Sequence, residues 1–164
     1  MKMKTRLHAF AVLLLVSSGV GFSAEGDAPK QGAGKVVRLL SIGNSFSRNA
    51  TEYLPELAKA RGHQLIHGAI IVGGSSMQLH AEKAQKNEKD PQDTTALYAN
   101  KRSLKDELRA NKWDFVSIQQ SSIKSHDLST FQPHAGWLRD YIKLHAPQAE
   151  LLVHQTWAYR RDDK

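Results

Sequence analysis

Four apolar stretches separated by helical patterns organise the chain after residue 35. The first, at residues 36–42 (VVRLLSI), is an almost continuous apolar run that contains β-branched residues. Such a run is typical of a strand that is buried on both faces, as in a parallel sheet. Comparable runs predict three further strands, at 64–72, 113–119 and 150–154.

Between the strands, apolar residues recur at helical spacing. In residues 49–61 this spacing predicts a helix, and Pro55 places the start of its regular part near Leu54, because proline fits only the first turn. Residues 75–98 are polar and ambiguous. The spacing predicts two further helices, at 103–112 and 130–145.

The alternation of strands and helices predicts parallel βαβ units with right-handed crossovers and helices on both faces of the sheet. The expected fold class is therefore α/β. In such sheets, ligands bind beyond the carboxyl ends of the strands. We expect the four loops that follow the strands to converge there, namely residues 43–47, 73–76, 119–122 and 155–159.

The first of these loops carries a serine that is suited to nucleophilic chemistry. Ser45 comes just past the buried strand, and Gly43 lets the backbone turn sharply. A serine near the start of a helix also meets free N–H groups, which stabilise an alkoxide or an oxyanion. The pattern has two interpretations: Ser45 is a catalytic nucleophile, or it is a polar residue in an ordinary turn.

The other loops contain groups that can line a site around this serine. Gly73 and Gly74 let a backbone N–H approach a substrate closely, although an ordinary turn also explains them. Gln119 and Gln120 can donate to a developing oxyanion, or one of them caps the sheet edge. Trp157 either lines a substrate pocket or covers the end of the sheet. The candidates for pocket residues are Asn44, Gly73, Gln119, Ser121 and Trp157.

The first residues of the chain indicate export. Three basic residues precede an apolar stretch at 7–16 and a run rich in small residues at 17–24, which is the pattern of a secretory signal peptide. The apolar stretch is short for a membrane span, which needs roughly 20 residues, so an uncleaved anchor is the less favoured alternative. We therefore expect a secreted or periplasmic protein without a stable membrane anchor after cleavage. The predicted segments are a signal peptide at 1–23, a flexible leader at 24–35 and a domain at 36–164.

The amino-acid composition argues against several classes of function. Cysteine is absent, which excludes disulfides and thiolate catalysis. The formal net charge of +7 falls to +4 when the predicted signal peptide is removed, and the remaining basic residues are mixed with acidic ones. Since nucleic-acid binding requires a basic stripe or patch, we expect no nucleic-acid partner.

The motifs together resemble the SGNH/GDSL hydrolase superfamily and, within it, the DUF4886 group. The resemblance rests on VRLLSIGNSFSRNATEYLPELAKARG, GGSSMQLH, KWDFVSIQQSS and VHQTWAY, and it covers most of the chain after residue 35. It implies a flavodoxin-like three-layer α/β/α sandwich with a parallel sheet. It also implies an exported serine ester hydrolase that needs no cofactor and acts on small-molecule or glycan esters.

By this resemblance Ser45 is the nucleophile, and the oxyanion hole consists of Ser45, Gly74 and Gln120. Asn44 stands where most members have aspartate, and Gln119 and Gln120 stand where most have a Gly-x-Asn-Asp motif. The superfamily's base is the histidine of an Asp-x-x-His block, and no such block occurs in residues 1–164. A serine without a base is a poor nucleophile at neutral pH. The simplest explanation is a C-terminally truncated chain with an incomplete fold.

Two other functions stay open. The missing block favours a non-catalytic domain of the same fold that binds a glycan or another small ligand. A metal site formed by His63, His67 and His80 is a further alternative. Strand geometry would separate the first two of these histidines by about 13 Å, so solvated surface histidines are the preferred interpretation.

Overall fold

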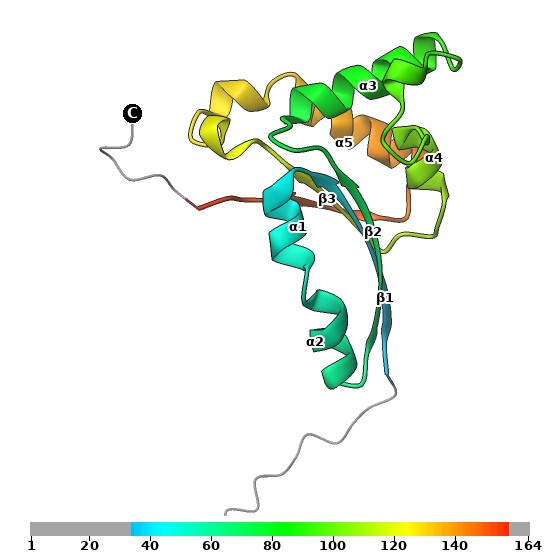
Figure 1. The fold of residues 1–164 in the computed structure, drawn as a ribbon, viewed down its shortest axis with the longest axis vertical. Coiled ribbons are helices and arrows are strands. Elements are labelled where there is room, and N and C mark those ends of the chain that lie inside the picture. The colour runs from blue at the N-terminus through cyan, green and yellow to red at the C-terminus, as the bar shows by residue number, and fades with distance from the viewer. Residues whose placement is uncertain (1–33, 158–164) are drawn as a thin grey trace, which may run out of the picture. The chain divides into compact units, whose positions relative to one another are not determined.

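The computed structural model describes residues 34–157, so the predicted signal peptide lies outside the described part of the chain. Its centre is a four-stranded sheet in the order β2-β1-β3-β4 (Figure 1). All neighbouring strands are parallel, which confirms the predicted α/β fold class. The strands are β1 (Val36–Gly43), β2 (Gln64–Ile71), β3 (Phe115–Gln119) and β4 (Glu150–His154), close to the four predicted stretches.

Five α-helices flank this sheet in the described residues. They are α1 (Ser45–Thr51), α2 (Leu54–Ala60), α3 (Met77–Lys89), α4 (Leu104–Arg109) and α5 (His134–His145). The connection from β1 to β2 runs toward one edge of the sheet, whereas the next two run toward the other edge. Right-handed crossovers therefore place α1 and α2 on one face and α3, α4 and α5 on the opposite face (Figure 1).

The prediction of one helix in residues 49–61 is wrong, because the structure has two short helices there. The first begins earlier, at Ser45, where the Asn44 side chain caps it by accepting the Phe46 N–H at 3.0 Å. The second begins at Leu54 with proline in its first turn, as the sequence predicts. Only the capping residue Asn44 therefore separates the end of β1 from the start of α1, where the sequence predicted a loop at residues 43–47.

The polar segment 75–98 contains the 13-residue helix α3 and a 3₁₀ helix, η1 (Thr94–Ala96). The apolar face of α3 was hard to recognise because much of it consists of small residues, such as Ala81 and Ala84, between long polar ones. Helix α5 begins at His134 and not at residue 130. The residues before it form two short 3₁₀ helices, η2 (Ser122–Lys124) and η3 (Leu128–Phe131).

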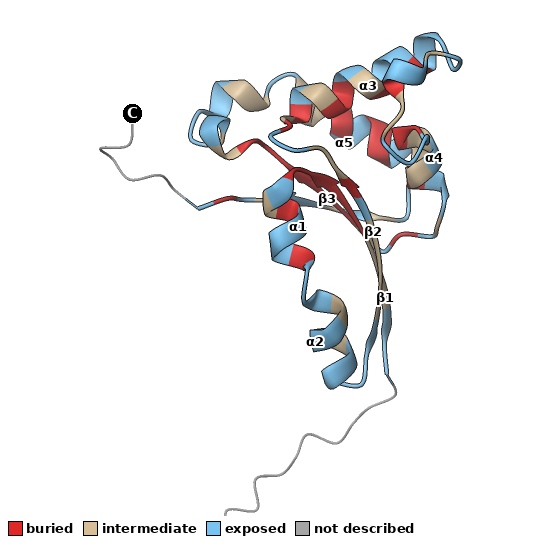
Figure 2. Cartoon of the chain, viewed as in Figure 1, coloured by how far each residue is buried: buried red, intermediate tan, exposed pale blue. Residues whose placement is uncertain are grey.

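The hydrophobic core lies between the sheet and the face that carries α3, α4 and α5 (Figure 2). Leu40, Ile42, Val116 and Ile118 point into it from β1 and β3, and each is at most 1% exposed. Burying a side chain of this size stabilises the fold by roughly 1.5–3 kcal/mol. This core fixes β1 and β3, and with them the loops at their carboxyl ends. The helices add Met77, Ala81, Ala84, Leu104, Leu108, Leu138, Tyr141 and Ile142.

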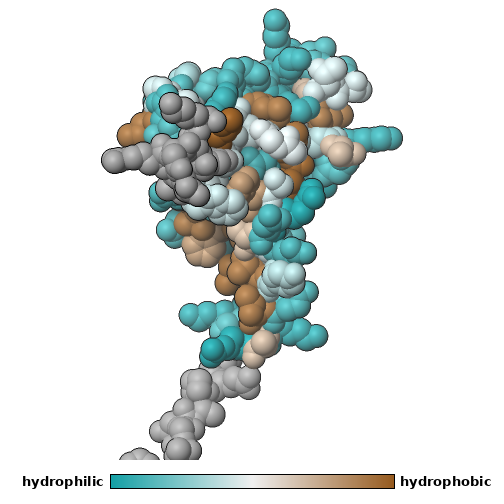
Figure 3. Space-filling model, turned by 60° about the vertical axis from the view of Figure 1, so that its left-hand side comes forward, coloured by the Kyte–Doolittle hydropathy of each residue, from teal (hydrophilic) through white to brown (hydrophobic). Residues whose placement is uncertain are grey.

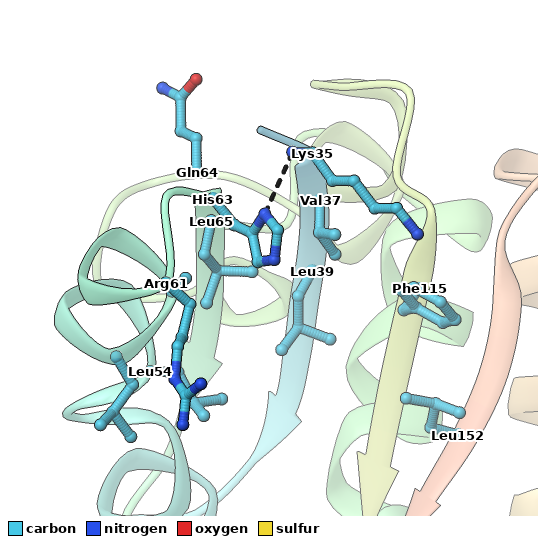
Figure 4. Close-up of a pocket in the computed structure, with 12 residues that line it drawn as sticks. Lys35, Val37, Leu39, Leu54, Arg61, His63, Gln64, Leu65, Phe115 and Leu152 are labelled. Atoms are coloured by element: carbon cyan, nitrogen blue, oxygen red, sulfur yellow. Dashed lines mark hydrogen bonds between the residues drawn. The ribbon is translucent and has the colours of Figure 1, made fainter. Parts of the chain in front are cut away.

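The opposite face of the sheet is only partly covered. An apolar groove of about 490 Å³ runs between α2 and the strands, and apolar side chains gather along this part of the surface (Figures 3 and 4). Its apolar lining includes Val37, Leu39, Leu54, Leu57, Leu65, Phe115 and Leu152. In residues 34–157, no helix combines the length and the apolar composition that a membrane crossing requires.

Candidate functional site

Loops after β1, β2 and β3 meet at the carboxyl end of β1. The Gly43 carbonyl accepts the Val72 N–H at 3.0 Å and the Ser75 hydroxyl at 3.1 Å. The Asn44 side-chain amide donates to the Ser75 carbonyl at 2.9 Å. These bonds join the second loop to the first, and the side chain of Gln119 joins the third to them, as the parallel sheet predicts.

Asn44 and Gln119 form a buried amide pair at the centre of this junction. The Gln119 Nε2 donates to Asn44 Oδ1 at 3.0 Å, and its Oε1 accepts the Asn44 backbone N–H at 3.4 Å. The same Oε1 accepts the Ser47 N–H at 3.1 Å and the Ser47 hydroxyl at 2.5 Å. Asn44 and Gln119 are 2% and 1% exposed. Their mutual bonds explain why the cost of burying two amides is tolerated here.

Gly43 is required by the close approach of these groups. A Cβ at this position would lie 2.7 Å from Gln119 Oε1 and 3.0 Å from Gln119 Cβ. Any larger residue would therefore displace the glutamine that holds the first turn of α1. The sequence predicts that Gly43 permits a sharp turn, whereas the structure shows that its missing side chain makes room for Gln119.

Ser45 is the exposed member of the junction. It lies between the buried Asn44 and the half-buried Phe46, as the first residue of α1. Its hydroxyl makes no hydrogen bond with any side chain or backbone group in residues 34–157. The loop is therefore held by its neighbours, while the Ser45 side chain stays accessible to a substrate.

The glycine loop beside Ser45 is open to solvent. Gly74 has a φ of 66°, a left-handed conformation that favours glycine, and Gly73 precedes it. A Cβ built on either residue meets no heavy atom within 4 Å. A substrate can therefore reach the backbone at this position without displacing a side chain.

The two adjacent glutamines point in opposite directions. Gln120 Oε1 accepts the backbone N–H groups of Met77 at 3.2 Å and Ser121 at 2.9 Å. Its Nε2 donates to the Thr130 carbonyl at 2.8 Å. Since neighbouring residues at a strand end face opposite sides of the sheet, only Gln119 reaches the loop that carries Ser45. The Gln120 amide, to which the family resemblance gives a role in the oxyanion hole, ties the start of α3 to residues 121 and 130.

The fourth loop also reaches the junction. Trp157 packs on Phe46 with ring centroids 4.4 Å apart and stays 64% exposed. His154, the last residue of β4, has its Nδ1 3.5 Å from Ser47 Oγ, and burial lowers the pKa of His154 below its ordinary value. The sequence pattern does not predict the role of Ser47. Its buried position two residues after the exposed Ser45 becomes apparent only once the helix start is known.

The three histidines of the metal hypothesis have separate partners. His63 Nδ1 accepts the Lys35 N–H at 3.2 Å, as Figure 4 shows, and His67 Nε2 lies 3.1 Å from Ser41 Oγ. His80 contacts Ser75 instead. Within the part of the chain that the structure describes, no three histidine, cysteine, aspartate or glutamate residues form a group that could hold a metal ion.

Comparisons with known proteins found a family and a solved structure that this chain resembles. The model of the family "Domain of unknown function (DUF4886)" matches residues 38–164. The fold is similar to the crystal structure of a DUF4886 family protein from Bacteroides uniformis ATCC 8492, with a TM-score of 0.65 and 32% sequence identity. That match covers 76% of this chain and 51% of the solved one, so the chain spans about half the length of its relative. No curated protein matches the sequence.

Proposed function

This chain belongs to the DUF4886 family, and we propose that it carries the nucleophile of an exported serine ester hydrolase of the SGNH type. The observation that carries the proposal is the exposed Ser45 hydroxyl, set at the carboxyl end of β1 beside the buried Asn44–Gln119 pair. A rigid support and an accessible hydroxyl are what a nucleophile needs for repeated attack on a carbonyl carbon.

In the proposed reaction, Ser45 Oγ attacks the carbonyl carbon of an ester and its proton passes to a general base. The oxygen of the tetrahedral intermediate accepts hydrogen bonds from the Ser45 and Gly74 N–H groups. Collapse of the intermediate releases the alcohol, which takes up the proton, and water then hydrolyses the acyl-enzyme. The open surface at Gly73 and Gly74 supports this assignment, because the ester oxygen can reach the loop.

The proposal requires a base outside residues 1–164. The two histidines that contact this junction bond to other serines and not to Ser45: His154 Nδ1 lies 3.5 Å from Ser47 Oγ, and His80 Nε2 lies 2.9 Å from Ser75 Oγ. An Asp-x-x-His block, which these 164 residues do not contain, would supply the missing histidine and its orienting carboxylate. We assign that block to a further segment of the same fold, supplied with this chain in the active enzyme.

Esters linked to carbohydrates, or other small esters, are the proposed substrates. Trp157 supports this class, because an exposed indole beside a nucleophile offers an apolar surface for a sugar ring or an acyl group. Export through the predicted signal peptide at 1–23 would bring the enzyme to such substrates.

A fluorophosphonate probe tests the proposal, since it reacts with activated serines. The full gene product should be labelled and should hydrolyse an aryl ester, and Ser45→Ala should abolish both. Ser129→Ala, which changes another exposed serine, is the matched control and should retain both. A protein that carries the Asp-x-x-His block and yet shows neither labelling nor turnover would refute the hydrolase.

A non-catalytic ligand-binding domain is the second candidate. The observation in its favour is that the Ser45 hydroxyl has no partner among the described residues that could act as its base. In that case glycans should bind with the same affinity to the wild type and to Ser45→Ala in calorimetric titrations, whereas Trp157→Ala should weaken the binding. Loss of aryl ester turnover in Ser45→Ala would contradict this alternative.

A further inference from the structure

Two buried polar side chains and a partly buried tyrosine form a hydrogen-bonded chain that ends at the glycine loop. The His80 ring on α3 has its Nε2 2.9 Å from Ser75 Oγ and its Nδ1 3.0 Å from the Tyr98 hydroxyl. Ser75 is 3% exposed and His80 is 1% exposed. The hydrogen-bonded path begins at Tyr98, passes through α3 and ends at the loop that holds Gly74.

The hydrogen bonds of Ser75 favour one of the two tautomers of the His80 ring. The single Ser75 hydroxyl proton lies between the Gly43 carbonyl at 3.1 Å, which can only accept, and His80 Nε2 at 2.9 Å. When that proton goes to Gly43, His80 Nε2 donates to Ser75 Oγ, and its Nδ1 accepts the Tyr98 hydroxyl proton. In the opposite tautomer the Gly43 carbonyl keeps the Val72 N–H but loses the Ser75 hydroxyl as a donor.

The neutral ring fits this arrangement. Burial lowers the pKa of His80, a hydrogen bond with the Gly43 carbonyl opposes this, and the nearby Lys83 adds to the lowering, with a net value of about 4. A protonated ring would donate from both nitrogens, so the Tyr98 hydroxyl proton would lose its acceptor. The neutral ring with its proton on Nε2 therefore keeps the bonds to Ser75 and Tyr98 together with the Ser75–Gly43 bond.

The far end of this path contacts the Gly43–Asn44 peptide, one residue before Ser45. Gly43 supplies the carbonyl of the Gly43–Asn44 peptide, and the Ser75 hydroxyl donates to it. The Ser75 carbonyl in turn accepts the Asn44 side chain at 2.9 Å. Ser75 therefore contacts both the Gly43 carbonyl and the Asn44 side chain, and His80 contacts Ser75.

We propose that His80 is a positioning residue, which acts through Ser75 to fix the distance between the loop of Gly74 and the loop of Ser45. The proposal rests on the proposed function in one respect, because Ser45 and Gly74 are the groups whose relative position matters for ester attack. Its structural part, a fixed neutral tautomer that restrains the two loops, stands independently of catalysis.

The structural part is tested by nitrogen-15 NMR of the histidine rings and by amide exchange. His80 should show the Nε2–H tautomer from pH 5 to pH 8, and His80→Leu should raise amide exchange at Ser75 and Asn44 about 10-fold or more. The control is His145→Leu, which removes another largely buried histidine whose ring nitrogens make no hydrogen bonds and should leave those amides unchanged. An Nδ1–H tautomer, or titration near pH 6.5, would overturn the proposal.

Tyr98→Phe keeps the proposal testable if His80→Leu does not fold. This change removes only the donor to His80 Nδ1, so the Nδ1 resonance should move and a second tautomer should become populated. An unchanged Nδ1 resonance would show that the path from Tyr98 to Ser75 does not exist.

The catalytic part is tested by the rate of fluorophosphonate labelling in the full gene product. His80→Leu should lower the maximal rate of labelling about 10- to 100-fold with unchanged reagent affinity, as expected for misplaced groups. His80→Gln, whose amide can still donate to Ser75, should recover most of that loss. Equal maximal rates of labelling in the wild type, His80→Leu and His80→Gln would refute the positioning role. A wild type that is not labelled at all would instead refute the hydrolase, while the NMR result would still decide the structural part.

Discussion

The Gln119 side chain is the clearest point at which to perturb the junction below Ser45. Gln119→Leu keeps most of the side-chain volume and removes all of its hydrogen bonds. Ser47 would then lose the acceptor for its N–H, and the Asn44 N–H and Oδ1 would lose their Gln119 partners, at positions sealed from water. The Ser47 hydroxyl has an alternative, because His154 Nδ1 lies 3.5 Å away.

Each buried polar group without a partner costs about 1–3 kcal/mol. The Asn44 Oδ1 retains the Phe46 N–H, and the bond from the Asn44 N–H is long at 3.4 Å, so Ser47 contributes the largest part. We expect Gln119→Leu to lower the free energy of unfolding by about 2–4 kcal/mol. For a domain of this size the melting temperature would fall by roughly 6–20 °C.

Chemical denaturation and thermal melting measure this loss directly. Gln148→Leu is the matched control, because that exposed glutamine makes a single hydrogen bond, to the Trp113 carbonyl at 3.2 Å, and should cost less than about 1 kcal/mol. Equal stability losses in the two variants would refute the reasoning that the Asn44–Gln119 pair holds the turn.

Two further predictions concern pH and the glycine loop. His80 has a folded-state pKa of about 4 and an unfolded value of about 6.5, so the free energy of unfolding should fall by up to about 3 kcal/mol as the pH falls from about 6.5 to about 4. Denaturation of His80→Gln should show a flatter dependence of stability on pH, and a dependence identical to that of the wild type would contradict the buried neutral ring. Gly74→Ala should lower the free energy of unfolding by about 1 kcal/mol, because Gly74 has a positive φ, although the added Cβ would meet no steric clash. The same change should slow labelling of Ser45 more than Gly73→Ala does, and the reverse order would assign the oxyanion N–H to Gly73.

The four strands could be predicted because a mostly apolar run of residues marks each of them in the sequence. The apolar runs of β1 and β3 are buried by the core on one face and form central strands of the sheet, so their sequences contain few polar positions. The parallel connections then require convergence of the loops at one edge. The helix α3 was missed for the opposite reason: its buried residues include His80 and Asn87, which periodicity treats as polar.

The contacts within the site could not be derived from sequence in the same way. Whether Gln119 or Gln120 faces the Ser45 loop depends on the side of the sheet to which each residue points, and one position in the strand register reverses the answer. The bonds of His80 depend on a helix that the sequence does not clearly predict. The exposure of Ser45 likewise follows from the start of α1 at that residue, which the Asn44 cap determines.

Mass spectrometry of the labelled protein would identify the nucleophilic serine. After reaction of the full gene product with a fluorophosphonate and proteolysis, the account predicts one modified peptide, with the added mass on Ser45 and none on the neighbouring Ser47 or Ser41. The modification should disappear when the protein is unfolded before the reaction. Modification of another serine, or none in a protein that carries an Asp-x-x-His block, would contradict the account.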